Sequence, residues 1–246
     1  MRIIGLDLGS RRTKAAYFID GQIWETAIFD SWPLSQAEIL KWVEGRPRDN
    51  AACTGYGRRL AADKLKCKII TEISAFSLGA NILAPDAATI IDIGGQDSKV
   101  IKREKNGEIG DFEMNDRCAA GTGKFFELIA RTLGISFDEL VISALNSNEV
   151  VPISSVCAVF AESEIIGKLA EGAARADIAR GIFNSVAQRI HAMVRRIAGL
   201  GPFILVGGGA NLALSRELES FLKSPIFLPE RGSFFGAVGA ALSALK

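Results

Sequence analysis

Two short stretches of the sequence combine an aspartate with glycines in a pattern that suits phosphate and metal chemistry. The first reads Asp7-Leu-Gly9-Ser10 and the second reads Asp92-Ile-Gly94-Gly95. Each follows an apolar run rich in β-branched residues, which predicts a strand that ends in a tight turn. Such a turn presents backbone N–H groups to an anion, and the nearby carboxylate suits a hydrated Mg²⁺.

The two stretches belong to an internal repeat with an offset of 85 residues. Positions of the same chemical type coincide in the two copies, which align Asp7 with Asp92, Gly9 with Gly94, Thr13 with Ser98 and Lys14 with Lys99. Each copy then reaches a hairpin signal, Asp20-Gly21 in the first and Asn106-Gly107 in the second, of the kind that favours a type I′ turn. The repeat predicts two similar halves, each opening with strand, tight turn, strand and hairpin.

The side chains of this repeat suggest roles in phosphoryl transfer. Asp7 and Asp92 are candidates for holding the metal and positioning water, and Gln96 for orienting the attacking water. The expected phosphate contacts come from backbone, hydroxyl and ammonium groups at Gly9, Ser10, Thr13, Lys14, Gly94, Gly95 and Lys99. Turn capping by the aspartates and Gln96, and simple solvation of the lysines, are alternatives that the residues leave open.

A third glycine turn follows a predicted strand at Phe203–Val206 and reads Gly207-Gly208-Gly209. Backbone without side chains lets an adenine and ribose approach closely. With two Asp-x-Gly turns facing each other across a cleft, this order of motifs favours a bound nucleotide. Gly121-Thr-Gly-Lys124 is not read as a P-loop, because Cys118 and Phe125 occupy the positions of its first Gly and its Ser/Thr.

The four cysteines, Cys53, Cys67, Cys118 and Cys157, show no spacing typical of a disulfide framework. Cys118 and Cys157 precede predicted helices, where the positive end of the helix dipole favours a thiolate. Position alone leaves two interpretations open for this pair, burial in the core and ligation of a metal cluster. Cys53 and Cys67 are expected to be structural.

Helical spacing of apolar residues predicts a helix-rich second half. The predicted helices are Pro33–Val43 with Leu34 on its apolar face, Gly123–Leu133, Phe137–Leu145, Val159–Ala170 and the amphipathic Asp177–Ala198 with Arg180 in solvent. The segment 81–88 is the expected linker. Strands that alternate with helices indicate an α/β fold with mixed sheets in two lobes.

Composition excludes several classes of protein. Apolar residues make up 48% of the 246 residues, which can fill a sizeable core, and the net charge of +1 argues against a nucleic-acid binder. The longest apolar stretches are shorter than a membrane span, and a charge interrupts the first apolar run before a signal peptide forms. We expect a cytoplasmic protein that binds neither nucleic acid nor membrane.

The motifs resemble those of the actin, sugar kinase and Hsp70-like ATPases, and more specifically the activator ATPases of 2-hydroxyacyl-CoA dehydratases and the ATPase subunits of benzoyl-CoA reductase. The segments that carry the resemblance are 92–99, 115–124, 157–164, 55–58, 72–73 and 235–241. The resemblance implies two duplicated actin-like, ribonuclease H-like lobes with ATP or ADP and Mg²⁺ in the cleft between them. Their expected extents are 1–86, completed by a C-terminal helix at 233–246, and 87–232. Gly236 is then an additional nucleotide contact.

For the cysteines the same resemblance implies one [4Fe-4S] cluster per homodimer, held by Cys118 and Cys157 of both copies. It also implies ATP-driven transfer of a low-potential electron from a ferredoxin or flavodoxin to a partner dehydratase or benzoyl-CoA reductase-like component. Phe76, Arg11, Arg12 and the placing of Asn211 depart from the family pattern. Two other functions stay open, a small-molecule kinase of the same superfamily and a non-redox ATP-gated switch.

Overall fold

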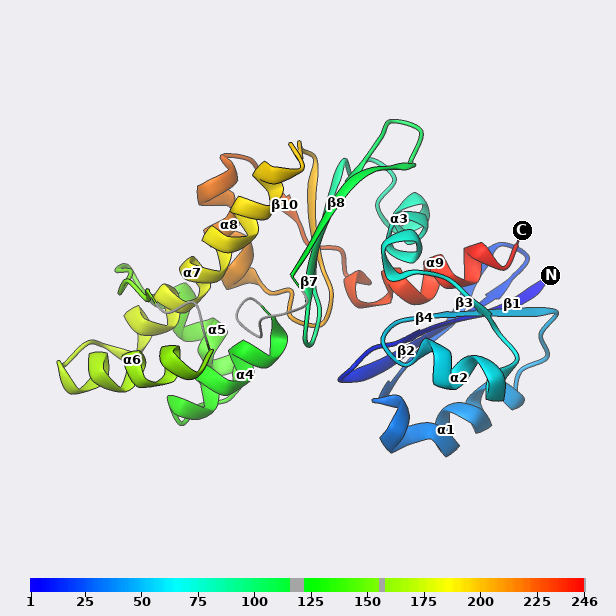
Figure 1. Cartoon of the computed structure of the whole chain (residues 1–246), viewed down its shortest axis with the longest axis horizontal. Helices are drawn as coiled ribbons and strands as arrows, with labels where there is room; N and C mark the ends of the chain where they lie inside the picture. Colours follow the sequence, from blue (N-terminus) through cyan, green and yellow to red (C-terminus); the bar gives the residue numbers. More distant parts are fainter. Residues whose placement is uncertain (116–121, 155–157, 246) are drawn as a thin grey trace. The chain divides into compact units, whose positions relative to one another are not determined.

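The computed structural model describes residues 1–115, 122–154 and 158–245. The chain divides into two compact units (Figure 1). Unit 1 comprises Met1–Ala87, Arg103–Gly110 and Pro229–Lys246, and unit 2 comprises Ala88–Lys102 and Asp111–Leu228. The structure contains two five-stranded sheets, which confirms the predicted α/β class.

The sheet of unit 1 has the strand order β3-β2-β1-β4-β5. Its strands are β1 (Arg2–Leu8), β2 (Arg12–Ile19), β3 (Gln22–Asp30), β4 (Asn50–Thr54) and β5 (Lys68–Ile69). β1 pairs antiparallel with β2 and parallel with β4, and β4 pairs parallel with β5. The sheet is therefore mixed, with its parallel part on the side of β4.

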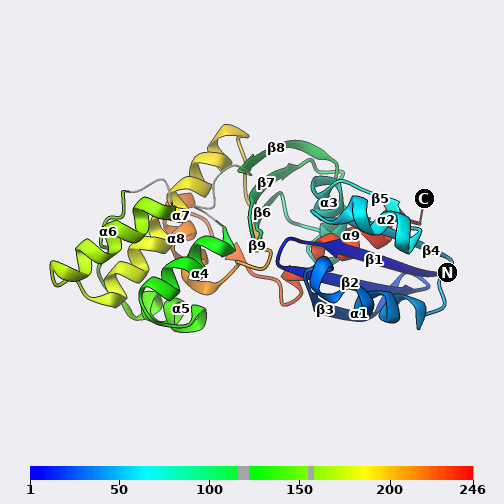
Figure 2. The ribbon, with the colours of Figure 1, turned by 60° about the horizontal axis from the view of Figure 1, so that its bottom comes forward.

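Helices cover both faces of this sheet (Figure 2). They are α1 (Trp32–Glu44), α2 (Arg58–Leu65), α3 (Glu72–Leu83) and α9 (Phe235–Ser243), the last preceded by the 3₁₀ turn Gly232–Phe234. One core cluster joins the sheet to α1 and α2, and a second joins it to α9. Burial on both faces explains why β1 is apolar almost throughout rather than alternating.

Glycines let α9 lie close to its neighbours in unit 1. A Cβ at Gly239 would lie 1.7 Å from the carbonyl oxygen of Ala75, and one at Gly79 would lie 2.2 Å from that of Phe235. A Cβ at Gly5 on β1 would lie 2.0 Å from a backbone oxygen of α9. Since real Cβ atoms do not approach backbone so closely, α3, α9 and β1 fit together only with glycine at these positions.

The sheet of unit 2 repeats the topology of unit 1. Its order is β8-β7-β6-β9-β10, with strands β6 (Thr89–Ile93), β7 (Ser98–Arg103), β8 (Ile109–Asn115), β9 (Phe203–Val206) and β10 (Ile226–Phe227). β6 pairs antiparallel with β7 and parallel with β9, as β1 does with β2 and β4. The duplication predicted from the 85-residue offset is thus present in the fold.

The helices of unit 2 share one apolar core with its sheet. They are α4 (Gly123–Thr132), α5 (Phe137–Asn146), α6 (Ala158–Ala170), α7 (Arg175–Arg196) and α8 (Leu212–Leu222). Phe126 of α4 and Phe183 of α7 are fully buried, and their ring centroids lie 4.8 Å apart. The four helices predicted in this half are confirmed, whereas α8 was not predicted.

The two hairpin turns differ in type. Asp20 and Gly21 both have positive φ, of 49° and 82°, which confirms the type I′ turn. In the second hairpin only Gly107 has positive φ, and its N–H donates to the carbonyl of Glu104. The predicted type I′ turn at Asn106-Gly107 is therefore wrong, because the loop is longer and needs the left-handed conformation only at its glycine.

Three other predictions are corrected. Leu34 is exposed because α1 is broken at Ser35, so its first turn does not share the phase of the buried residues that follow. Arg180 is not a solvated side chain, since it forms an ion pair with the buried Glu217. The linker expected at 81–88 begins later, because α3 continues to Leu83.

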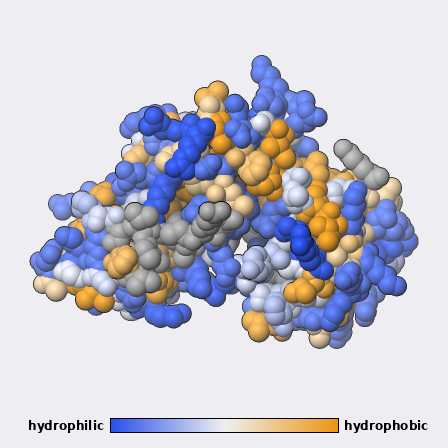
Figure 3. Space-filling view, in the orientation of Figure 1, coloured by the Kyte–Doolittle hydropathy of each residue, from blue (hydrophilic) through white to orange (hydrophobic). Residues whose placement is uncertain are grey.

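No helix among the described residues is long and apolar enough to cross a membrane. The face of the molecule in Figure 3 mixes hydrophilic and hydrophobic side chains.

The close contact of α3 with α9 can be tested by adding a single methyl group. We expect Gly239→Ala to lower the free energy of unfolding by about 3 kcal/mol, because the added Cβ meets backbone that cannot move aside alone. Gly167→Ala in α6 is the matched control, since its Cβ would meet nothing within 4 Å, and it should stabilise by up to ~1 kcal/mol. Urea unfolding followed by circular dichroism measures both changes. Equal stabilities of the two variants would contradict the packing described.

Candidate functional site

Each unit places an aspartate opposite a lysine on neighbouring antiparallel strands. Asp7 is the cross-strand partner of Lys14 between β1 and β2, and Asp92 is that of Lys99 between β6 and β7. The register follows from the tight turn that joins each pair of strands. We call residues 7–14 the Asp7 turn and residues 92–99 the Asp92 turn.

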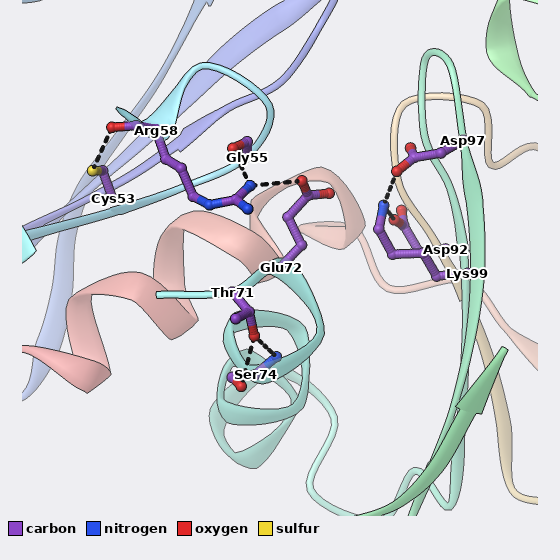
Figure 4. A network of polar contacts seen from close by, with 9 residues as sticks. All are labelled: Cys53, Gly55, Arg58, Thr71, Glu72, Ser74, Asp92, Asp97 and Lys99. Atoms are coloured by element: carbon purple, nitrogen blue, oxygen red, sulfur yellow. Dashed lines mark hydrogen bonds and ion pairs between the residues drawn. The ribbon is translucent and has the colours of Figure 1, made fainter. Parts of the chain in front are cut away.

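In the Asp92 turn the lysine is buried between two carboxylates (Figure 4). The Nζ atom of Lys99 lies 3.2 Å from Oδ2 of Asp92 and 2.6 Å from Oδ2 of Asp97. The Lys99 side chain is 2% exposed, so its ammonium depends on these carboxylates for compensation. Leaving a buried charge without its partner costs about 3–5 kcal/mol, which makes this cluster a rigid part of unit 2.

The Asp7 turn has the same pair in a looser form. Nζ of Lys14 lies 3.8 Å from Oδ2 of Asp7, and the Lys14 side chain is 14% exposed. The Asp7 carboxylate lies against the first turn of α9, where a Cβ at Gly236 would come within 2.8 Å of Oδ2. Glycine at this position leaves room for the carboxylate beside a helix N-terminus, whose dipole favours negative charge.

The third glycine turn lies against the Asp92 carboxylate. Gly207 has a φ of +94°, and a Cβ there would lie 2.2 Å from Oδ1 of Asp92. The N–H of Gly209 donates to the carbonyl of Ile93 at 2.9 Å. Gly208, in contrast, is exposed, and a Cβ there would meet nothing within 4 Å. The turn is therefore fixed at its two ends and open at its middle.

The start of α4 is attached to the glycines of the Asp92 turn. The N–H of Gly123 donates to the carbonyl of Gly94 at 2.9 Å, and the N–H of Lys124 donates to that of Gly95 at 3.0 Å. These amides already have acceptors, so they do not form a phosphate cradle of the P-loop kind. This agrees with the sequence-based rejection of a P-loop at Lys124.

The remaining predicted residues differ in exposure. Gln96 is exposed, and Gly9 and Ser10 are half-buried. The hydroxyls of Thr13 and Ser98, which are equivalent in the repeat, are both buried, and no hydrogen-bond partner for either is present among the described residues. These two hydroxyls are therefore shielded from solvent in the structure.

Several contacts were missed by sequence reasoning. Arg58, at the start of α2, donates from Nη1 to the carbonyl of Gly55 at 2.8 Å and lies 3.7 Å from Oε1 of Glu72 (Figure 4). Asn211 caps α8 by accepting from the N–H of Leu214 at 3.0 Å. The cap was predictable, because Asn directly before an apolar helical run is a start signal. Phe76, which departs from the family pattern, is buried in α3.

The two cysteines expected to hold a cluster, Cys118 and Cys157, lie outside the described residues. α6 begins at Ala158, the residue after Cys157, and α4 begins at Gly123. Within residues 1–115, 122–154 and 158–245, no group of three or more His, Cys, Asp or Glu side chains is arranged to hold a metal ion.

Comparison with known proteins identifies the family. The model of the BadF/BadG/BcrA/BcrD ATPase family matches residues 4–244. The chain belongs to this family. The match spans both copies of the internal repeat and therefore includes both aspartate turns.

Individual members of the ATPase family align over almost the whole chain. The (R)-2-hydroxyglutaryl-CoA dehydratase activating ATPase of Acidaminococcus fermentans is 37% identical, covering 99% of this chain and 96% of its own length. A benzoyl-CoA reductase subunit from Thauera aromatica is 30% identical, with coverages of 97% and 91%. The solved structure of the 2-hydroxyisocaproyl-CoA dehydratase activator of Clostridium difficile with bound ADPNP has a TM-score of 0.90, 39% identity and coverages of 99% and 94%.

Two adjacent glycines of the third turn provide a matched pair of variants. Gly207→Ala should destabilise the protein by about 1–3 kcal/mol, because it introduces a side chain at positive φ and against the Asp92 carboxylate. The free energy of unfolding of Gly208→Ala should lie within about 0.5 kcal/mol of that of the parent, since its side chain would enter open space. Thermal unfolding of the two variants checks this, and a destabilised Gly208→Ala would contradict the geometry.

Proposed function

We propose that this protein is the ATP-hydrolysing activator of a 2-hydroxyacyl-CoA dehydratase or of a related CoA-thioester reductase, to which it supplies a low-potential electron. The observation that carries the proposal is the end-to-end family match, together with relatives that are named as a dehydratase activating ATPase and a benzoyl-CoA reductase subunit. The same proposal places the protein in the cytoplasm, with a ferredoxin or flavodoxin as its electron donor.

The two aspartate turns are proposed to serve one ATP with its Mg²⁺. Asp7 and Asp92 would hold the metal ion and the attacking water, and Gln96 is exposed at the turn where it can orient that water. Mg²⁺ prefers oxygen ligands and keeps several waters, so two carboxylates are a suitable donor set. The bound ADPNP of the Clostridium difficile activator supports a nucleotide site in this fold.

Other groups complete the proposed nucleotide site. Gly9, Ser10, Gly94 and Gly95 supply backbone beside the two carboxylates, and the open middle of the third turn at Gly208 leaves space for adenosine. Gly236 keeps the first turn of α9 free beside Asp7. Lys99 is held by Asp92 and Asp97, so we assign it to positioning Asp92, whereas the partly exposed Lys14 is assigned to the phosphates. Thr13 lies within the Asp7 turn, where its hydroxyl is buried, and we keep it in the proposed site as part of that turn.

Cys118 and Cys157 are proposed to hold one [4Fe-4S] cluster between two copies of the chain. A cluster of this type takes four thiolates, and a two-fold axis supplies two from each copy. The position of Cys157 directly before α6 supports a thiolate, because the first turn of a helix favours negative charge. When bound, such a cluster supplies a one-electron centre of low potential.

Nucleotide binding and electron transfer are then linked through the affinity of each redox state for ATP. For a one-electron centre, a tenfold ratio of these affinities corresponds to ~59 mV of reduction potential. The proposed route for this link runs through α4, which begins on the carbonyls of the Asp92 turn and, in sequence, five residues after Cys118.

The nucleotide part of the proposal is tested by removing one carboxylate at a time. We expect Asp7→Asn and Asp92→Asn to lower the kcat of Mg²⁺-dependent ATP hydrolysis by about 100-fold or more. Each substitution replaces a carboxylate by a neutral amide and so removes the charge that would hold the metal. Asp86→Asn is the control, since Asp86 is exposed on the loop after α3, and its kcat should be unchanged. Unfolding curves of all three variants show whether a loss of activity is a loss of folding. Full activity of both Asp7→Asn and Asp92→Asn would refute these roles.

The iron-sulfur part is tested by purification without oxygen followed by iron and sulfide assays. One cluster per homodimer predicts about two irons per chain. Cys118→Ala and Cys157→Ala should each lose the iron, whereas the buried Cys67→Ala should keep it. An iron-free protein that transfers phosphate to a hydroxylated acceptor would instead identify a kinase.

A further inference from the structure

A cavity of about 500 Å³ lies at the margin of unit 1, away from the aspartate turn. It is lined by residues 46–49, which connect α1 to β4, by Asn50 and Ala51 at the start of β4, by Lys66 at the end of α2 and by Lys68 at the start of β5. β5 is the edge strand of this sheet (Figure 2). The volume of the cavity falls within the range of sites that bind small molecules.

Two of the charged side chains that line the cavity are already neutralised. Arg46 donates from Nε to Oε2 of Glu25 at 2.9 Å, and its guanidinium stacks 4.0 Å above the ring of Trp42. The hydrogen bond from Arg46 lowers the pKa of Glu25. Asp49 accepts from the backbone N–H of Arg2 at 2.8 Å and from the Arg2 guanidinium at 3.1 Å. Arg46 and Asp49 therefore contribute little net charge.

Three cations in the lining have no carboxylate partner among the described residues, Arg48, Lys66 and Lys68. Arg48 donates from Nη1 to the carbonyl of Val43 at 3.2 Å, and Lys68 donates from Nζ to that of Ser243 at 3.4 Å. Both are neutral acceptors. The lining thus carries about three positive charges without a carboxylate partner among the described residues, which favours an anion.

The backbone fixes the positions of these cations. Lys66 ends α2 in the left-handed conformation, with φ 49° and ψ 50°, and its N–H donates to the carbonyl of Ala62. Lys68 is held in register with Ala52 of β4. The backbone at the two lysines is therefore set by secondary structure and does not depend on a ligand.

We infer that this cavity binds a small multivalent anion of the phosphate type, such as a pyrophosphate or a phosphate ester with three or more negative charges. A guanidinium and two ammonium groups around one cavity match several phosphate oxygens, which accept from both kinds of donor. The limited volume favours a small ligand over a segment of protein.

This site is separate from the proposed nucleotide site. Asp7 pairs with Thr54 at the carboxyl end of β4, whereas the cavity is lined by Asn50 and Ala51 at the amino end of the same strand. The two ends of this strand are about 13 Å apart. The inference therefore does not depend on the proposed activity.

The test uses inorganic pyrophosphate as the probe, with the full chain in metal-free buffer at low ionic strength. Isothermal titration calorimetry measures its affinity for the parent protein and for Arg48→Gln, Lys66→Gln and Lys68→Gln. Each single variant should bind about threefold more weakly, and the triple variant about tenfold or more weakly. Lys105→Gln is the control of equal charge change, since Lys105 is exposed and does not line the cavity, and it should bind within about twofold of the parent.

The site of binding is located by amide chemical shifts. The expected result is that pyrophosphate shifts the amide signals of Asn50, Ala51, Lys66 and Lys68. Shifts confined to the glycines of the aspartate turns, or a triple variant that binds as tightly as the parent, would overturn the inference. Since all substituted side chains are at least partly exposed, the variants are expected to fold, and unfolding curves verify this.

Discussion

The cross-strand pairing of aspartate with lysine is the constraint on which the rest of this structure depends. It requires two antiparallel strands joined by a turn short enough to place residues seven apart directly opposite each other. The same register occurs in both units, so duplication preserved a pairing geometry and not only a set of residue types. Around each pair, glycine backbone replaces side chains, because the carboxylate needs the space. Gly236 serves Asp7 in this way, and Gly207 serves Asp92.

The two copies use the same pairing to different extents. In unit 2 a second carboxylate, from Asp97, contacts the buried Lys99 ammonium, which therefore has two anionic partners. In unit 1 the position corresponding to Asp97 is Arg12, which is exposed, and Lys14 reaches Asp7 only at 3.8 Å. One half therefore carries a rigid charge cluster and the other an adaptable one. The alignment of the repeats places Arg12 opposite Asp97, but only the structure shows that Asp97 contacts Lys99.

Sequence patterns predicted those features that are local. The strand ends at Asp7 and Asp92, the type I′ turn at Asp20-Gly21 and the long helices each follow from residues within a few positions of one another. Features that depend on how the strands and helices pack were missed. The partners of Lys99 and Arg58, and the burial of Thr13 and Ser98, are set by how strands and helices assemble. Leu34 shows a third case, in which a break at Ser35 shifts the helical phase on which the prediction relied.

The attachment of α4 to the Asp92 turn has a mechanical consequence. Two adjacent amides of the first helical turn donate hydrogen bonds to two adjacent carbonyls of the glycine loop. Neither element can slide along the other without losing both bonds. The apolar face of α4, which includes Phe125, Phe126 and Ile129, is buried in the core of unit 2. A shift of the glycine loop that keeps both bonds must therefore also move side chains of that core, so the loop and the core adjust together.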